Sequence, residues 1–200
     1  KQAYYGILPE SNSHEGYYPA KHSYWDDFWA LKGFKDGVYL AGVLGEKADA
    51  EWMSAEEQGF RKCLYDSMLK VIARSGLNNL PGCVELGDTD PTSTSVAIMA
   101  CDEGDSLPKP FGLNTFDVYW QNFTPRLKPG GEQTFTPYES RNADVFVRIG
   151  QRGRALTVLR YFTSQSSRPP AWNHLAEVVH AKPRAPSYIG DMPHTWCGSD

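Results

Sequence analysis

The sequence predicts an all-α protein built from repeated antiparallel helical hairpins. Apolar residues recur every three or four positions over most of the chain, whereas the strict alternation of a half-buried β-strand is nearly absent. Short polar and aromatic clusters also recur where helices are expected to begin, and successive clusters start 64, 50 and 53 residues apart. Two helices of about 15 residues and their loops occupy roughly that length. The clusters are Tyr24–Asp27, Asp88–Thr92, Tyr138–Arg141 and Asp191–His194.

The first half of the chain predicts a loop followed by one long hairpin. Residues 1–23 are rich in Gly, Pro, Ser, Asn and Tyr, a composition typical of loops. Apolar stripes at helical spacing then cover residues 24–45 and 48–74, and each ends at or near a glycine that can stop a helix. A second loop is expected at residues 80–89, which include a Pro-Gly pair.

The second half predicts shorter helices. Asp90 is suited to a helix N-cap and Pro91 to the first helical position, which predicts a helix over 92–101. The expected helices that follow are 115–127, 137–149, 152–164, a short one at 173–180, and one beginning at Asp191. If alternate helices run parallel, all four clusters gather at one end of the structure. Such an end offers aromatic faces and carboxylates, which suit a sugar.

Composition predicts one domain over residues 1–200 and excludes two classes of partner. The net charge is −4 and no basic stripe is present, which argues against nucleic acid because phosphate binding depends on Lys and Arg. No apolar run approaches the roughly 18–20 residues that cross a bilayer, so no membrane partner is expected. Since the chain lacks an initiator methionine, we expect a fragment of a longer protein.

The cysteines and histidines predict no metal and no cofactor. Four cysteines occur without a CxxC pair, so a structural zinc site is not expected; buried free thiols are favoured, with disulfides left open. His14, Glu15 and His22 lack the spacing of the HExxH zinc motif. The compartment stays open, with secretion or export to the periplasm as one option.

Four longer strings carry a resemblance to a known superfamily. They are Leu8–Tyr17, His22–Trp29, Pro81–Thr92 and Tyr188–Trp196, and together the likeness covers nearly the whole chain. They resemble a poorly characterised bacterial branch of the six-hairpin glycosidases. The resemblance implies an (α/α)6 toroid, of which this chain carries about half, and a sugar-binding funnel at its centre. The missing half would come from the rest of a longer chain or from a second copy of this one.

The resemblance and the clusters together nominate site residues for glycoside hydrolysis, usually with inversion, by two carboxyl groups. Glu85 is the candidate acid and Glu177 the candidate base, with Glu10 and Glu15 as rivals. The candidate sugar-binding residues are Trp25, Asp26, Asp27, Asp88, Tyr138, Glu139, Arg141, Trp172, Asn173, His194 and Trp196. Structural roles compete: Asp26 and Asp27 could complement the helix dipole, and Glu139 could pair with Arg141.

Two other functions fit the same residues. A polysaccharide lyase or sugar epimerase could use Tyr138, Arg141 and His194 for proton transfer. A non-catalytic module could bind carbohydrate, or serve only as structure, with its carboxylates misplaced. An open half-toroid also exposes an apolar edge, which predicts self-association.

Overall fold

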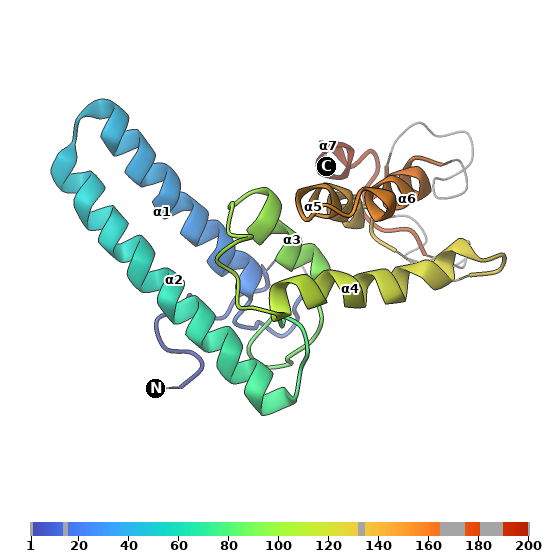
Figure 1. Ribbon diagram of the computed structural model, residues 1–200, viewed down its shortest axis with the longest axis horizontal. Coiled ribbons are helices and arrows are strands. Elements are labelled where there is room, and N and C mark those ends of the chain that lie inside the picture. The colour runs from blue at the N-terminus through green and yellow to red at the C-terminus, as the bar shows by residue number, and fades with distance from the viewer. Residues whose placement is uncertain (1, 14–15, 132–134, 165–174, 181–189, 200) are drawn as a thin grey trace. The chain divides into compact units, whose positions relative to one another are not determined.

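Helices make up the regular structure of the part of the chain that the structure describes. The computed structural model shown in Figure 1 describes residues 2–13, 16–131, 135–164, 175–180 and 190–199. Within these ranges the regular structure consists of helices, and the only extended pairings are three isolated bridges. The all-α prediction is confirmed. None of the described helices is long and apolar enough to span a bilayer.

The chain folds into two compact units, unit 1 over residues 1–115 and unit 2 over residues 116–200. The boundary lies within one helix, α4 (Phe111–Phe123). Helical hairpins occur in both units, but the closed ring of a toroid and the single domain over residues 1–200 stay predictions.

Unit 1 contains the long predicted hairpin. Figure 1 shows α1 (Tyr24–Leu44) and α2 (Lys47–Ser75) side by side and antiparallel, within one residue of the expected bounds. Gly45 ends α1 with a φ of 79°, a left-handed conformation that glycine adopts without steric cost. The buried core between the two helices comes from Phe28, Leu31, Leu64, Met68 and Val71.

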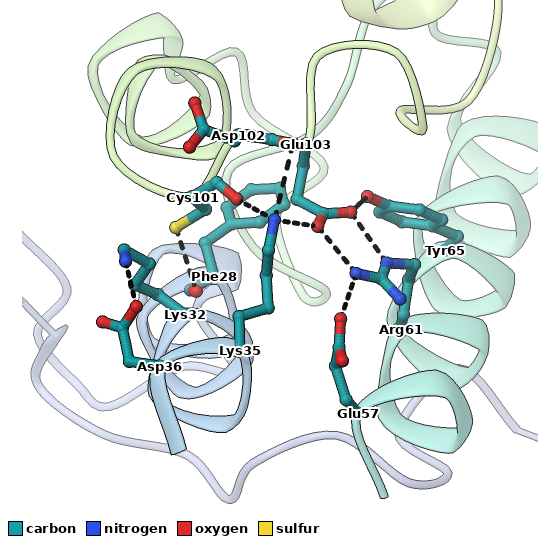
Figure 2. Close-up of polar contacts among 10 residues, drawn as sticks. All are labelled: Phe28, Lys32, Lys35, Asp36, Glu57, Arg61, Tyr65, Cys101, Asp102 and Glu103. Atoms are coloured by element: carbon teal, nitrogen blue, oxygen red, sulfur yellow. Dashed lines mark hydrogen bonds and ion pairs between the residues drawn. The ribbon is translucent and has the colours of Figure 1, made fainter. Parts of the chain in front are cut away.

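A buried ion-pair network ties α1 and α2 to the loop that follows α3 (Pro91–Met99), as Figure 2 shows. The Glu103 side chain is only 1% exposed. Its carboxylate accepts hydrogen bonds from Arg61 Nε at 2.8 Å, Tyr65 Oη at 2.6 Å and Lys35 Nζ at 2.9 Å. Burial raises the pKa of Glu103, but the hydrogen bonds, chiefly from Arg61, outweigh it and bring the pKa to about 2. The network therefore holds an ionised carboxylate in the interior of unit 1.

The start of α3 follows the sequence prediction. The Asp90 carboxylate accepts hydrogen bonds from the backbone amides of Thr92 at 3.1 Å and Ser93 at 3.0 Å, and Pro91 is the first helical residue. These bonds satisfy two of the amides that a helix leaves unpaired at its start.

Unit 2 contains a shorter hairpin on an aromatic core. Its helices are α5 (Asn142–Arg148) and α6 (Arg152–Thr163), preceded by a 3-10 turn, η3 (Pro137–Arg141). The predicted helix 137–149 is therefore a 3-10 turn followed by two turns of α-helix. The rings of Phe116, Phe123, Phe146 and Phe162 are fully or almost fully buried.

Backbone pairing replaces two predicted helices near the end of the chain. Residues 175–180 are not helical, and residues 173–174 lie outside the described residues. Phe135 and Val179 exchange backbone hydrogen bonds at 2.9 Å each, and the amide of Glu177 donates to Asp191 O at 3.0 Å. The helix expected from Asp191 begins only at Thr195, as α7 (Thr195–Ser199). Long-range pairing of the Asp191 carbonyl and the His194 amide explains why residues 191–194 stay outside the helix.

Candidate functional site

The four polar-aromatic clusters come together in pairs, one pair within each unit. In unit 1 the amide of Tyr24 donates to Gly82 O at 3.0 Å, and that of Val84 donates to His22 O at 3.0 Å. The start of α1 therefore lies against the loop that leads into α3. In unit 2 the Tyr138 hydroxyl lies 3.3 Å from His194 Nε2. The gathering of all four clusters at one end stays a prediction.

Four predicted carboxylates in unit 1 share the N-terminal segment as a partner and are called the acidic cluster: Asp26, Asp27, Glu85 and Asp88. Each accepts hydrogen bonds from the N-terminal segment, residues 8–13 and 16–22. The donors are Ser11 Oγ and Ser13 Oγ to Asp26 at 2.5 and 2.7 Å, the Leu8 amide to Asp27 at 2.9 Å, Tyr17 Oη to Asp88 at 2.8 Å, and the His22 amide to Glu85 at 3.0 Å. The acidic cluster thus anchors the N-terminal segment over the start of α1.

Glu85 has a second contact with His22, whose Nδ1 lies 2.6 Å from the carboxylate. Partial burial raises the pKa of Glu85, but the hydrogen bond from the His22 ring and those from backbone amides outweigh it. The net pKa lies below the usual range. An ionised Glu85 is better suited to a base or a hydroxyl acceptor than to the acid role predicted from the sequence.

Asp27 is the most perturbed carboxyl of the acidic cluster. Its residue is 1% exposed, and burial raises its pKa to about 7 despite the hydrogen bond from Leu8; the charge of Asp26 adds to the rise. Asp27 Oδ2 has no hydrogen-bond partner within the described part of the chain. Trp25 is half-buried and lies edge-on to Trp29, with ring centroids 5.8 Å apart.

Unit 2 gathers a Tyr–His cluster, defined as Tyr138, Arg141, His194 and Trp196. Besides the Tyr138–His194 contact, the Arg141 guanidinium carbon lies 4.8 Å from the centroid of the Tyr138 ring. The Trp196 ring lies edge-on to Tyr138 at 6.1 Å, and Trp196 remains 46% exposed. Four residues predicted from two separate parts of the sequence therefore form one site.

A pocket of about 810 Å³ adjoins the Tyr–His cluster. Apolar side chains from α5, α6 and α7 line it together with six polar or charged residues: Ser140, Asp144, Arg152, Thr163, His194 and Thr195. Concave sites of about 300–1,000 Å³ with an apolar lining and a few polar groups are typical of small-molecule binding. The pocket and the Tyr–His cluster are thus continuous through the imidazole of His194.

Glu139 is paired with a residue that the sequence did not nominate. Its carboxylate lies 2.7 Å from Arg126 Nη1, and both Glu139 and Arg141 are buried. Burial raises the pKa of Glu139, while the guanidinium of Arg126 opposes the rise. Glu139 thus forms an ion pair with Arg126, a structural contact that competes with the predicted sugar contact.

Glu177 is half-buried, and its backbone is fixed on both sides. Thr136 Oγ1 donates to Glu177 O at 2.8 Å, and the same hydroxyl accepts from the Tyr138 amide at 3.3 Å. Glu177 is therefore tethered close to the start of η3. Trp172 and Asn173 lie outside the described residues. Because Glu85 and Glu177 belong to different units, their separation stays a prediction.

Among the described residues, no three His, Cys, Asp or Glu side chains gather as metal ligands would. The four cysteines are free thiols, and three of them are buried. In comparisons with known proteins, no family model, no curated protein and no solved structure matches this chain. The glycosidase resemblance therefore enters below only as part of a proposal.

Proposed function

We propose that this chain binds carbohydrate at the Tyr–His cluster and takes part in the hydrolysis of a glycosidic bond. The observation that supports this best is the combination of an exposed indole, a phenol and an imidazole at the edge of a ligand-sized pocket. The half-exposed Trp196 offers a flat apolar face for a sugar ring. Tyr138 and His194 supply groups that can both donate to and accept from sugar hydroxyls.

The chemistry requires one protonated and one ionised carboxyl group on either side of the bond. Since the pKa of Glu85 is lowered, we assign Glu85 as the base and Glu177 as the acid, the reverse of the roles expected from the sequence. Inverting hydrolysis would need the two carboxyl groups roughly 6.5–9.5 Å apart. The missing wall of the funnel would come from a longer chain or a second copy, which light scattering on this chain would distinguish.

The test is turnover and product analysis on a panel of oligosaccharides and aryl glycosides. Glu85→Gln and Glu177→Gln should each lower the rate on the order of 10²–10⁴-fold, whereas Glu56→Gln, on the exposed face of α2, should leave it unchanged. Full turnover in both site variants would overturn the carboxylate assignment. Binding that depends on Trp196 with no turnover in the wild type would favour a non-catalytic module.

A second candidate is a polysaccharide lyase or epimerase, favoured by the Tyr138–His194 contact and the nearby guanidinium of Arg141. Tyrosine and histidine can transfer a proton to or from a sugar carbon, and arginine can bind an acidic sugar's carboxylate in two-point fashion. A lyase leaves an unsaturated product that absorbs ultraviolet light, and an epimerase leaves the bond intact. Tyr138→Phe would then abolish the reaction, while Glu177→Gln would spare it.

A further inference from the structure

We propose that the pocket of unit 2 is an aglycone subsite, which holds an aryl or alkyl group attached to the sugar bound by the Tyr–His cluster. The inference rests on the proposed function and narrows its substrate class to glycosides with an apolar substituent. It is carried by the lining of the pocket, its continuity with His194, and its size.

Several apolar side chains that line the pocket are exposed to solvent. Val147 from α5 and Leu156 and Leu159 from α6 all line it, and they remain 54%, 46% and 49% exposed. The buried side chains of Phe162 and Cys197 also line it. Covering exposed apolar surface in a concavity is favourable by about 25 cal/mol for each Å² removed from water. An apolar ligand would gain this term, whereas a bare sugar, which is covered with hydroxyls, would not.

Two of the polar lining residues connect the pocket to the Tyr–His cluster. The lining also includes Asp144, Arg152, Thr163 and Thr195. His194 lines the pocket and also contacts the Tyr138 hydroxyl through Nε2, so a sugar at Tyr138 lies next to the apolar walls. Ser140, two residues after Tyr138, lines the pocket as well. A single ligand with a sugar at one end and an apolar group at the other would fill both parts.

The size of the pocket is that of a small-molecule site. Its volume of about 810 Å³ is within the range of ligand sites. The lining comes from α5, α6 and α7, together with Ser140 of η3, Leu175, and Pro193 and His194 before α7.

The first experiment measures binding of a free aglycone, the fluorescent probe 4-methylumbelliferone, by fluorescence titration. We expect saturable one-to-one binding to the wild type and at least tenfold weaker binding to Leu159→Gln and Leu156→Gln. Both leucines are about half exposed, so their polar variants should fold, which circular dichroism checks. Leu44→Gln, at an exposed leucine of α1, is the matched control and should bind like the wild type. Absent binding, or equal binding by the pocket and control variants, would overturn the inference.

The second experiment compares 4-methylumbelliferyl glycosides with methyl glycosides of the same sugars. We expect the aryl compounds to bind at least tenfold more tightly, and Leu159→Gln to remove that preference. Equal binding or cleavage of aryl and methyl glycosides would refute the subsite while leaving the proposed function standing. Binding of the free probe with no glycoside bound more tightly than the probe would instead refute the proposed function and leave an apolar ligand pocket.

Discussion

The replacement of Glu103 by glutamine tests whether the buried ion-pair network stabilises unit 1. The variant keeps the shape of the side chain but removes the charge that faces Arg61 and Lys35. A pKa of about 2, against about 4.3 for an ordinary glutamate, corresponds to roughly 3 kcal/mol at 1.36 kcal/mol for each pKa unit. Breaking a buried ion pair from one side costs about 3–5 kcal/mol, which agrees. We therefore expect Glu103→Gln to lower the free energy of unfolding by about 3 kcal/mol.

The pH dependence of the free energy of unfolding provides a second test of the Glu103 network. Because the folded-state pKa of Glu103 is depressed, its contribution is fully present above the unfolded pKa and is lost as the pH falls from about 5 to 2. Urea unfolding followed by circular dichroism should show a midpoint lower by about 1 M at pH 7, and a smaller gap between variant and wild type near pH 2. Glu56→Gln, on the exposed face of α2, is the control. A Glu103→Gln midpoint equal to that of the control at pH 7 would refute the reasoning.

Three further substitutions test local contacts. Asp27→Asn should stabilise the protein above pH 7, on the order of 4 kcal/mol, because the raised pKa of Asp27 makes its ionisation costly as the pH rises from about 4 to 7. Asp26→Asn is the control and should not stabilise the protein. An equal gain for Asp26→Asn in urea unfolding would contradict the explanation by the pKa of Asp27. Asp90→Ala removes the cap of α3 and should cost about 0.5–2 kcal/mol, so an unchanged thermal midpoint would argue against the cap. Arg126→Met leaves the buried Glu139 carboxylate without its ion-pair partner and should lower the free energy of unfolding by about 3–5 kcal/mol at pH 7. The loss should be smaller in acid, where the Glu139 carboxyl is protonated. A loss of stability that does not change with pH would count against the ion pair.

The helices that the sequence predicted best are those with strong local signals. A stripe of apolar residues at helical spacing and a stop at Gly45 or Gly76 place α1 and α2 to within one residue. Asp90 followed by Pro91 fixes the start of α3 for an equally local reason, since the cap bonds join residues two and three positions apart. These signals lie within one or two helical turns of sequence, so the helix ends can be predicted without knowledge of the tertiary structure.

What the sequence missed depends on contacts between distant residues. The segment from Asp191 has a proline and an acidic start, yet the backbone of residues 190–194 pairs with residues 175–178 and does not become helical before Thr195. The partners of the acidic cluster were not predicted either, although the donors lie in strings already singled out by resemblance. His22 and Glu85 are 63 positions apart, and Tyr17 and Asp88 are 71 apart. No periodic pattern encodes such pairs.

The anchoring of the N-terminal segment also sets an order of events during synthesis on the ribosome. The bonds from His22 to Glu85 and from Tyr17 to Asp88 can form only after the chain has been made past residue 88. At about 5–20 residues per second, the segment waits roughly 3–15 s for its partners. All residues of α1 and α2 have been made before then, so this hairpin can form first. The N-terminal segment can then pack against the start of α1. The N-terminal segment, although it is made before α1, is therefore among the last parts of unit 1 to reach its final position.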